Sequence, residues 1–451
     1  MNYDYIIIGG GPCGLTIANI LSKKFKILII DKNDSLGGCH RVTRTNGLFS
    51  EHSPRVYSNS YLNFIKILND MNINFYDIFT KYKYNSLTLV QKLNKYMTFK
   101  EYYIFIIEFI KYNYNNTNEI TVDEFMIKHN FNNGAKNIIN CLCLSLDGTD
   151  STKFLLYNFF SIINNTSMYN LYIPKYPNDK ILFKLWYNYL IKNNVDILLN
   201  YNIINIIDNN NIIIEGKDFK KKNIYGKNFI FACPPVALCD ILIKSKYPYL
   251  FGDIYKWSNE TKYNNYIPMT FHYNNKLKLK SVWGVANDTE WGIIFIIMSD
   301  YMNFNDKRSN TVISITLSTP PINISKDKII LGTYEQLLKI LPELPYPDNI
   351  VFENDNDISF ASTKLGYMNY KSNIFNNFYT CGHHIGQSNI EYNTLESAVI
   401  NGLNLCKHLI NIPIKIYKPI TLLIILKILI IILFVFLIIK FIKYNNILYK
   451  K

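Results

Sequence analysis

The N-terminal stretch YIIIGGGPCGLTIANILSKKFKILIID, residues 5–31, decides the fold of this chain. Tyr5–Ile8 is a short apolar run that stops at glycine, which predicts a buried parallel strand. Leu15 to Ser22 predicts a helix, and Phe25–Ile30 predicts a second strand that ends at Asp31. Strand, glycine turn, helix, strand and acid follow one another in the order of a dinucleotide-binding unit.

Three glycines of this unit, Gly9, Gly11 and Gly14, have the spacing G-x-G-x-x-G. We expect the first to permit the tight turn, the second to let a pyrophosphate approach the backbone, and the third to let the helix pack on the strand. The start of the helix offers N–H groups and a positive dipole end to the phosphates. Asp31 is placed to accept hydrogen bonds from a ribose 2′-hydroxyl, and an acid there argues against NADP.

The composition is that of a folded chain with more than one domain. Its 451 residues exceed one small core, and 49% hydrophobic against 18% charged residues exclude a disordered chain. The formal charge of +14 comes from lysines dispersed along the chain, so a lysine-rich background explains it better than nucleic-acid binding. The eight cysteines form no C-x-x-C pair and no zinc-type spacing, which suits a reducing compartment and predicts no metal site.

A glycine pair follows the acid. In KNDSLGGCHRVT, residues 32–43, five residues separate Asp31 from the pair Gly37 and Gly38. With this motif the chain resembles the FAD-dependent amine oxidase and phytoene desaturase superfamily. The resemblance implies an FAD cofactor, with the backbone of the glycine pair along its pyrophosphate.

The residues after the glycine pair depart from the superfamily pattern. An arginine and a threonine or serine normally follow the pair, but Cys39 and Val42 hold those places here. Arg41 lies nearby, and the resemblance makes it a candidate for the arginine's contact with the cofactor. An ordinary surface arginine is the alternative interpretation.

Two later stretches carry the same resemblance. VDILLNYNIINI, residues 195–206, resembles the strand pair that passes the adenine, and Ile203 stands where a backbone group binds that base. NFIFACPP, residues 228–235, resembles a strand that ends in Ala-x-Pro-Pro near the cofactor.

The stretch FYTCGHHIGQSNIEYNTLESAVINGLNLCKHL, residues 378–409, resembles the closing motif of the superfamily. The resemblance implies that Gly382 approaches the ribityl chain and that Thr394 and Leu395 open a helix directed at the flavin C2 oxygen. Such a helix end stabilises the negative charge of a reduced flavin. His383 stands where the superfamily often has an acid, and together with His384 it leaves metal binding as an alternative.

The segment FSEHSPRVYSN, residues 49–59, holds the catalytic candidates. The resemblance places it beside the reacting part of the flavin, with Ser53 and Pro54 near the cofactor and His52 and Arg55 bordering the reaction space. A histidine whose pKa lies near neutrality suits a general base. A polar surface turn is the alternative interpretation.

One FAD needs both the N-terminal and the C-terminal motifs, so the expected cofactor domain is discontinuous. We expect an α/β fold: a Rossmann-like FAD-binding domain of residues 1–75, 175–250 and 355–412, with an inserted α+β substrate domain of residues 76–174 and 251–354. The first insert reads as mainly helical. The second contains strand-like runs such as YIPMTFHYNN and TVISITLS.

The second insert holds two further groups of candidates. Trp283 and Trp291 could line an aromatic substrate pocket or pack in a sheet. Members of the superfamily often hold a water near flavin N5 with a lysine, for which Lys276, Lys278 and Lys280 are the candidates.

The C-terminal run from Ile420 to Ile439 is almost wholly apolar, with one interruption at Lys427. Twenty helical residues span about 30 Å, the thickness of a bilayer core, so we expect a single transmembrane helix over residues 420–440. A buried core helix is the alternative. The short connection from Asn411 to Pro419 should hold the catalytic part close to the bilayer, and we expect that part to be cytosolic.

These features predict a membrane-anchored FAD-dependent oxidoreductase that transfers a hydride from an amine or lipid-like substrate to flavin N5. Two other functions stay open. One is a non-redox flavoenzyme of the sugar-nucleotide mutase type, against which the scarcity of arginine counts: Arg41, Arg44, Arg55 and Arg308 are the only ones. The other is a catalytically inactive FAD-binding membrane scaffold.

Overall fold

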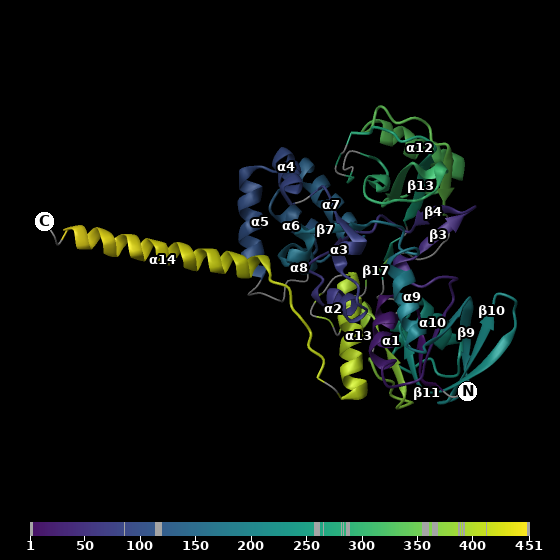
Figure 1. Ribbon diagram of the computed structural model, residues 1–451. Helices are drawn as coiled ribbons and strands as arrows, with labels where there is room; N and C mark the ends of the chain where they lie inside the picture. Colours follow the sequence, from purple (N-terminus) through teal and green to yellow (C-terminus); the bar gives the residue numbers. More distant parts are fainter. Residues whose placement is uncertain are drawn as a thin grey trace.

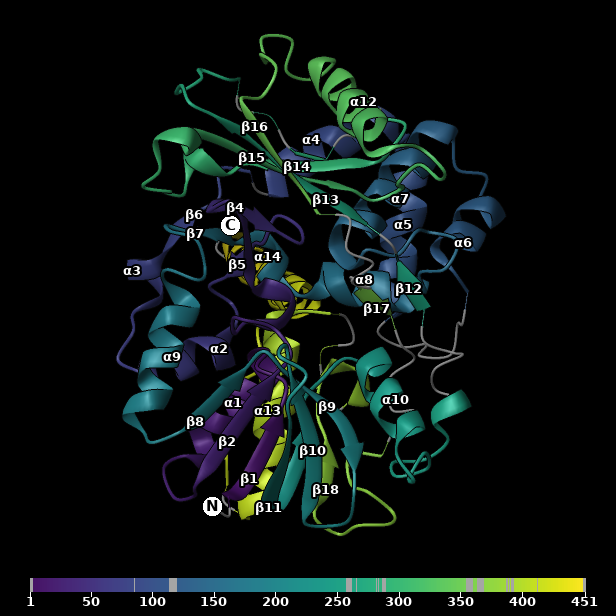
Figure 2. The same cartoon turned by 90° about the vertical axis from the view of Figure 1, so that its right-hand side faces the viewer.

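The computed structural model describes residues 3–84, 86–112, 120–256, 262–264, 266–280, 282, 284–285, 289–353, 360–362, 369–386, 388, 390, 393–411 and 413–448. Figures 1 and 2 show a body with two halves, one around a mainly parallel sheet and one of helices and an antiparallel sheet. A long C-terminal helix projects from this body (Figure 1).

The N-terminal strands lie at the centre of a seven-stranded sheet. Its order is β8-β2-β1-β11-β10-β9, and β18 pairs with β11 as well. The pairs β8–β2, β2–β1, β1–β11 and β11–β18 are parallel, whereas β9, β10 and the first half of β11 form an antiparallel meander. The strands are β1 (Tyr3–Ile8), β2 (Ile27–Asp31), β8 (Asp196–Leu199), β9 (Tyr201–Ile206), β10 (Asn211–Gly216), β11 (Lys221–Phe231) and β18 (Phe378–Thr380).

The apolar runs of β1 and β2 are explained by burial on both faces of the sheet. Ile7 belongs to one core and its neighbours Ile6 and Ile8 to another, as the two-residue period of a strand requires. The first core is closed by α1 (Pro12–Leu21), α2 (Leu62–Asp70), α9 (Leu182–Lys192) and α13 (Leu395–Ile410). The second core is closed by α10 (Pro235–Lys244).

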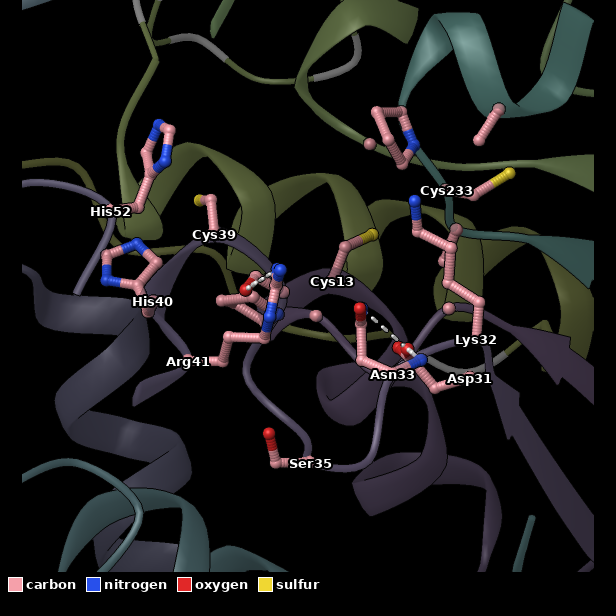
Figure 3. A pocket seen from close by; sticks show the side chains of 18 of the residues that line it. Cys13, Asp31, Lys32, Asn33, Ser35, Cys39, His40, Arg41, His52 and Cys233 are labelled. Carbon is pink, nitrogen blue, oxygen red and sulfur yellow. Dashed lines mark hydrogen bonds between the residues drawn. The ribbon is translucent and has the colours of Figure 1, made fainter. Parts of the chain in front are cut away.

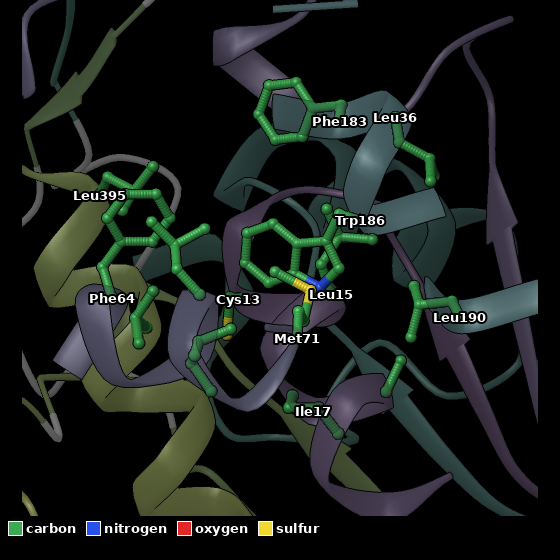
Figure 4. Packing of buried hydrophobic residues seen from close by; sticks show 14 of the residues in the cluster. Cys13, Leu15, Ile17, Leu36, Phe64, Met71, Phe183, Trp186, Leu190 and Leu395 are labelled. Atoms are coloured by element: carbon green, nitrogen blue, oxygen red, sulfur yellow. The ribbon is translucent and has the colours of Figure 1, made fainter. Parts of the chain in front are cut away.

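The first of these cores brings together residues from distant parts of the sequence. Figure 4 shows Leu15 of α1, Phe64 of α2, Trp186 of α9 and Leu395 of α13 around one apolar centre. The rings of Phe64 and Trp186 lie 6.3 Å apart between centroids. The start of α13 is therefore fixed by packing against N-terminal helices.

The second sheet is antiparallel, in the order β14-β15-β13-β16. β13 matches the YIPMTFHYNN run and β15 the TVISITLS run. α12 (Lys326–Leu338) contributes Ile329 and Leu337 to the core of this sheet. The hairpin of β3 and β4 joins it through His272, whose Nε2 lies 2.8 Å from the Phe49 carbonyl oxygen. The strands are β3 (Val42–Thr45), β4 (Leu48–Glu51), β13 (Ile267–Tyr273), β14 (Ile293–Ile297), β15 (Thr311–Leu317) and β16 (Asn349–Phe352).

The first insert is mainly helical, as the sequence predicts, and its helices share a core with Ile390, Ile400 and Leu423. Its helix α6 begins with a capping box between Thr121 and Glu124. The helices are α4 (Ser86–Tyr96), α5 (Phe99–Tyr112), α6 (Val122–Lys128), α7 (Asn133–Asp147) and α8 (Leu156–Asn164). Short elements complete the fold: α3 (Phe75–Ile78), β5 (Tyr57–Ser58), β6 (Phe79–Lys81), β7 (Leu171–Pro174), β12 (Lys262–Asn264) and β17 (Phe360–Ser362).

The last helix, α14 (Leu422–Leu448), leaves the body as a separate rod (Figure 1). Its segment Leu422–Ile442 has 21 residues and a mean hydropathy of 3.6, and only 6% of its most apolar window is buried. By length and composition this helix could cross a membrane. The alternative of a buried core helix is wrong for this arrangement, because nearly all of these side chains are exposed.

Some expected boundaries are wrong by a few residues, for reasons of backbone chemistry. The first helix begins at Pro12 and not at Leu15, because proline fits the first helical turn, where its missing N–H costs nothing. The strand expected to run to Pro235 ends at Phe231, and Pro235 opens α10 for the same reason.

Candidate functional site

A cavity of about 1150 Å³ lies at the carboxyl ends of the central parallel strands. We call it the central cavity. It is lined by the turn between β1 and α1, the end of β2, the segment after Gly37, β9, the segment after β11, and the segment from β18 into α13. Figure 3 shows polar side chains from several of these segments directed into it. In open parallel sheets this edge is the usual ligand site.

The candidate residues on this cavity come from both ends of the chain. They are Gly9, Gly11, Asp31, Gly38, Arg41, His52, Arg55, Ile203, Gly382, Thr394 and Leu395. The other candidates, Gly14, Gly37, Ser53 and Pro54, do not line it. Gly11, the N-cap of α1, and Leu395, the first residue of α13, thus share one cavity.

Close backbone approach explains why the first turn needs glycine. Gly9 has φ +110°, and a Cβ there would lie 2.4 Å from the Ala232 carbonyl oxygen. A Cβ on Gly14 would lie 2.0 Å from the Gly9 carbonyl oxygen, so this glycine lets α1 pack on the turn. Gly11 is different: a Cβ there would meet only the Gly38 Cα, at an ordinary 3.7 Å. Gly11 is therefore not needed for packing, and it leaves open space on the cavity side.

Asp31 holds the glycine turn as well as lining the cavity. Its Oδ2 accepts a hydrogen bond of 2.7 Å from the Gly10 N–H, and its Oδ1 accepts bonds from the backbone and side chain of Asn33 at 2.8 and 3.0 Å. A carboxylate has about four lone-pair sites, so capacity remains for a hydroxyl donor from the cavity. The aspartate thus has a structural role that the sequence pattern did not reveal.

The glycine pair forms a second turn against the first one. The Gly37 N–H donates to the Gly10 carbonyl oxygen at 2.8 Å. Gly37 itself faces away from the cavity, because a Cβ there would lie 2.6 Å from the Phe183 ring. Arg41 lines the cavity, and its Nη1 lies 3.4 Å from the Gly38 carbonyl oxygen, so it is not a remote surface arginine (Figure 3).

One end of the cavity is formed by β9. Ile203 lines it together with its neighbours Tyr201 and Asn202, and the side chain of Ile203 is 4% exposed. β9 is the last strand of the path that begins at β8, so its outer edge faces no further strand on that path. Pro234 and Pro235 line the cavity beyond the end of β11, where they close the Ala-x-Pro-Pro segment.

The opposite wall is the C-terminal segment that leads into α13. Gly382 has φ +145°, and Thr394 caps α13 by accepting a bond of 3.0 Å from the Ser397 N–H. His383 Nδ1 lies 2.5 Å from Ser397 Oγ. Burial lowers the pKa of His383 to about 4, so this histidine is neutral at pH 7. His383 therefore adds no positive charge at this wall, and the N–H groups in the first turn of α13 supply the partial positive charge of a helix N-terminus.

α13 is held beside α1 and α2 by close contacts. Glu396 accepts hydrogen bonds from the Asn63 N–H at 2.8 Å and the Phe64 N–H at 2.9 Å, both in the first turn of α2. A Cβ on Gly402 would lie 3.0 Å from the Cys13 carbonyl oxygen of α1. These contacts tie the C-terminal wall of the cavity to its N-terminal floor.

His52 and Arg55 both line the cavity, on the segment that follows β4. Arg55 Nη2 donates to the Cys39 carbonyl oxygen at 2.8 Å, and the ring of His52 lies 6.3 Å from that of Tyr266 between centroids. Their neighbour Glu51 is 3% exposed, and burial raises its pKa to about 8, against the opposing charge of Arg55. His52 and Arg55 therefore border the cavity, and their part in a reaction stays a prediction.

Other cavity residues escaped the sequence reasoning. His40 lines the cavity, and its Nδ1 lies 3.2 Å from the Tyr57 hydroxyl; burial, and then the charge of Arg55, lower its pKa. Cys13 and Cys381 also line it, with their sulfur atoms 2.9 Å apart. Cys13 could have been identified as a cavity residue from the sequence, because it lies between Gly11 and Gly14 of the glycine motif. No local pattern marks Tyr266, which the fold brings in from the second insert.

Several other candidates lie away from the cavity. Lys276 donates to the Ser299 carbonyl oxygen at 3.0 Å, and neither it nor Lys278 or Lys280 lines the cavity. Trp291 packs at the core of the second sheet, against Gly332 of α12, so it is a packing residue. Trp283 lies outside the described residues. Within the described part of the chain, no group of three or more metal-binding side chains accompanies His383 and His384.

Comparison with known proteins agrees with this architecture. The family described as NAD(P)-binding Rossmann-like domain matches residues 7–71. Wild-type putrescine oxidase with bound putrescine has a TM-score of 0.67 at 12% identity, covering 91% of this chain and 100% of that chain. Cyclohexylamine oxidase from Brevibacterium oxydans IH-35A has a TM-score of 0.64 at 12% identity, with 90% and 98% covered. An oxidoreductase from Methanosarcina mazei has a TM-score of 0.67 at 13% identity, covering 90% of this chain and 100% of that chain.

These similarities show that the chain has the fold of the amine oxidases, as its motifs predicted. A different match involves the DNA-directed RNA polymerase subunit beta″ of Plasmodium falciparum (isolate 3D7). It is 27% identical over 237 residues, which are 50% of this chain and 22% of that subunit. So small a share of the subunit transfers no activity to this chain.

Proposed function

We propose that this protein is an FAD-dependent oxidoreductase of the amine-oxidase type, anchored to a membrane by α14. One observation carries the proposal: the glycine turn at Gly11 and the start of α13 at Leu395 open into the same 1150 Å³ cavity. A dinucleotide is long enough to need both ends. A mononucleotide would be served by the N-terminal unit alone.

The residues on the cavity fit FAD from end to end. The open space at Gly11 suits the pyrophosphate, and the N-terminus of α1 supplies N–H groups for its oxygens. Asp31 retains capacity for a ribose hydroxyl, and β9 at Ile203 would border the adenine. Gly382 and the first turn of α13 would border the ribityl chain and the flavin ring.

FAD, when bound, supplies the acceptor for a hydride taken from a substrate carbon. The chain's own residues bind and orient the reactants. The first turn of α13 presents partial positive charge where negative charge develops. His52 is the proposed base that takes a proton from the substrate, and Arg55 fixes the segment on which His52 lies by its bond to the Cys39 carbonyl oxygen.

The substrate class follows from the fold and from the anchor. Putrescine oxidase and cyclohexylamine oxidase share this fold, which supports an amine as the substrate. The apolar helix α14 supports an anchor that keeps the enzyme at a membrane, where a lipid-like substrate would also reach it. We propose an amine or lipid-like small molecule and place the catalytic part in the cytosol.

The test is the visible spectrum of the purified full-length protein in detergent. The proposal requires bound flavin, and it requires the flavin bands to bleach when putrescine, cyclohexylamine or an unsaturated lipid is added without oxygen. A colourless protein that no added FAD restores would overturn it in favour of a membrane scaffold that has lost the cofactor.

The sugar-nucleotide mutase stays as a second candidate because of the cavity's arginines. Arg41, Arg44 and Arg55 all line the cavity, although Arg44 is paired with Asp179 at 2.8 Å. Two arginines near a bound flavin could hold the diphosphate of a sugar nucleotide. A flavin that ignores amines and lipids but responds to a sugar nucleotide would establish this second function.

A further inference from the structure

Helix α5 presents an apolar stripe to the outside of the body. Phe99, Tyr103, Ile106 and Ile110 recur at helical spacing, so they share one face. Their exposed fractions are 88%, 61%, 51% and 37%. Contiguous apolar side chains on a surface mark an interaction site, because water contact with them is unfavourable.

The opposite face of α5 is fixed to the body. The ring of Phe105 lies 5.2 Å from that of Phe160 in α8, and the ring of Phe109 lies 5.6 Å from the same side chain. Glu101 of α5 accepts a hydrogen bond from the Asn132 N–H at 2.5 Å, which ties the helix to the start of α7. The outward stripe therefore cannot turn inward without breaking this packing.

The root of α14 is fixed to the same group of helices. Leu423 is buried in the core that also contains Phe109, and its N–H donates to Asn164 Oδ1 of α8 at 3.0 Å. Thr166 Oγ1 donates to the Ile420 carbonyl oxygen at 2.6 Å. α8 thus lies between α5 and the start of α14, and it holds the two helices in a set arrangement.

That arrangement places α5 on the side of the body from which α14 leaves. Figure 1 shows α5 at this edge, with its axis running across that of α14. A bilayer crossed by α14 would lie parallel to α5 and directly against this edge. An amphipathic helix in this position lies in the plane of the interface, with its apolar face in the headgroup region.

The charged and aromatic residues around this edge suit an anionic bilayer. Lys100 and Lys111 are exposed on α5 beside the stripe. Lys418 is exposed just before α14, and Lys415 Nζ lies 4.8 Å from the centre of the Tyr417 ring. Lysine and tyrosine are the side chains favoured at the level of the headgroups.

We propose that the exposed stripe of α5 lies in the headgroup layer of an anionic membrane, as a second contact beside α14. The inference rests on the proposed anchoring by α14 and deepens it. Two contacts would stop the body from tilting at the root of α14, so that the central cavity keeps one orientation to the bilayer.

The test uses a photoreactive benzophenone side chain at Phe99 or Ile106 of the full-length protein. The protein is reconstituted in vesicles of phosphatidylcholine and phosphatidylserine, illuminated and analysed for lipid adducts. Phe219 is the matched control, because it is 82% exposed and lies in the turn between β10 and β11. Figure 1 shows these two strands on the far side of the body from α14. We expect several-fold more lipid adducts at positions 99 and 106 than at 219.

Alkaline extraction of the same vesicles reports on α14 separately. Retention in the membrane with adducts at positions 99 and 106 supports the proposal. Retention with no excess over position 219, or cross-links to a second copy of the chain, overturns the α5 contact and leaves the anchor standing. Extraction of the protein together with the loss of adducts overturns both. Extraction with adducts retained supports the α5 contact and overturns the anchor.

Discussion

The sulfur atoms of Cys13 and Cys381 lie 2.9 Å apart on the floor of the central cavity, although 368 positions separate the two residues. Cys13 belongs to the first turn of α1, and Cys381 directly precedes Gly382. The two ends of the folded body therefore meet at the site. The binding of a cofactor there must depend on the packing of C-terminal elements on N-terminal ones.

The contact between α13 and α1 is the first point to test. Gly402→Leu would force a side chain against the Cys13 carbonyl oxygen, since even a Cβ lies 3.0 Å from it. Overpacking of this kind costs about 1–3 kcal/mol, so we expect a lower free energy of unfolding and weaker FAD retention. Lys407→Leu, at an exposed position of the same helix, should change neither quantity. Denaturant unfolding and flavin content measure both, and equal behaviour of the two variants would refute the packing argument.

Substitutions of Gly11 and Gly14 should have different effects, one on cofactor binding and the other on folding. Gly11→Val adds its side chain on the open cavity side, so we expect a folded protein that no longer retains FAD. Gly14→Val places carbon against the Gly9 carbonyl oxygen and should prevent folding. Circular dichroism separates the two outcomes, and flavin absorbance reports on the cofactor. A fully loaded Gly11→Val protein would contradict the assignment of the phosphate site.

Glu51 should make stability depend on pH. Burial raises its pKa from 4.5 to about 8 in the folded chain. Between these values the folded chain holds a proton that the unfolded chain releases, so stability falls as pH rises, by up to about 1.4 kcal/mol per pH unit. Glu51→Gln removes this pH dependence, so the free energy of unfolding of the variant should rise relative to that of the wild type as the pH rises. Glu343 is exposed, so Glu343→Gln should show the same pH dependence as the wild type when both are unfolded with denaturant near pH 4.5 and near pH 8. A constant difference between Glu51→Gln and the wild type would show that Glu51 ionises normally.

His52 is tested by the rate at which substrate reduces the flavin. Loss of a general base lowers a rate by about 10²- to 10⁴-fold, so His52→Ala should reduce the flavin that much more slowly with an unchanged FAD content. Ser53→Ala is the matched control, because Ser53 is the next residue along the chain and does not line the cavity. The idea fails if both variants react at the wild-type rate in a stopped-flow measurement.

Removal of α14 should release the protein from membranes. A chain ending at Leu423 keeps the buried leucine and its bond to Asn164, so the body should stay folded. It loses the exposed apolar segment that we propose to cross the bilayer. After membrane fractionation with an alkaline wash, which also removes peripheral contacts such as that of α5, we expect the full chain in the pellet and the shortened chain in the supernatant. A shortened chain that stays in the pellet after an alkaline wash would show a further integral attachment.

The sequence predicted the parts of this fold that local pattern controls. The glycine spacing from Gly9 to Gly14, with Asp31 after the second strand, identifies the first unit. Gly9 and Gly14 meet short-range steric demands, and Gly11 leaves open space on the cavity side. The helix that opens at Thr394 was predicted from the resemblance of residues 378–409 to the closing motif of the superfamily. The contribution of β9 at Ile203 required the resemblance to a known superfamily.

Other features depend on tertiary contacts that a single sequence does not display. Tyr266 reaches the cavity only because the second sheet packs over the first half. The buried environment of Glu51 arises from its place under that sheet, and its own segment looks polar. The three lysines near position 278 were candidates because of the resemblance to the superfamily. They lie on the segment after β13, away from the cavity, where Lys276 donates to the Ser299 carbonyl oxygen.

The most direct test of the central claim is a calorimetric titration of the apoprotein with FAD and with ADP. It compares the wild type with Gly11→Val and with Ala398→Phe, whose added ring would enter the cavity from α13. We predict that Gly11→Val loses both ligands, whereas Ala398→Phe loses FAD and keeps ADP, because only the flavin end is blocked. FAD binding of wild-type strength in both variants would contradict a single flavin nucleotide held between the two ends of the body.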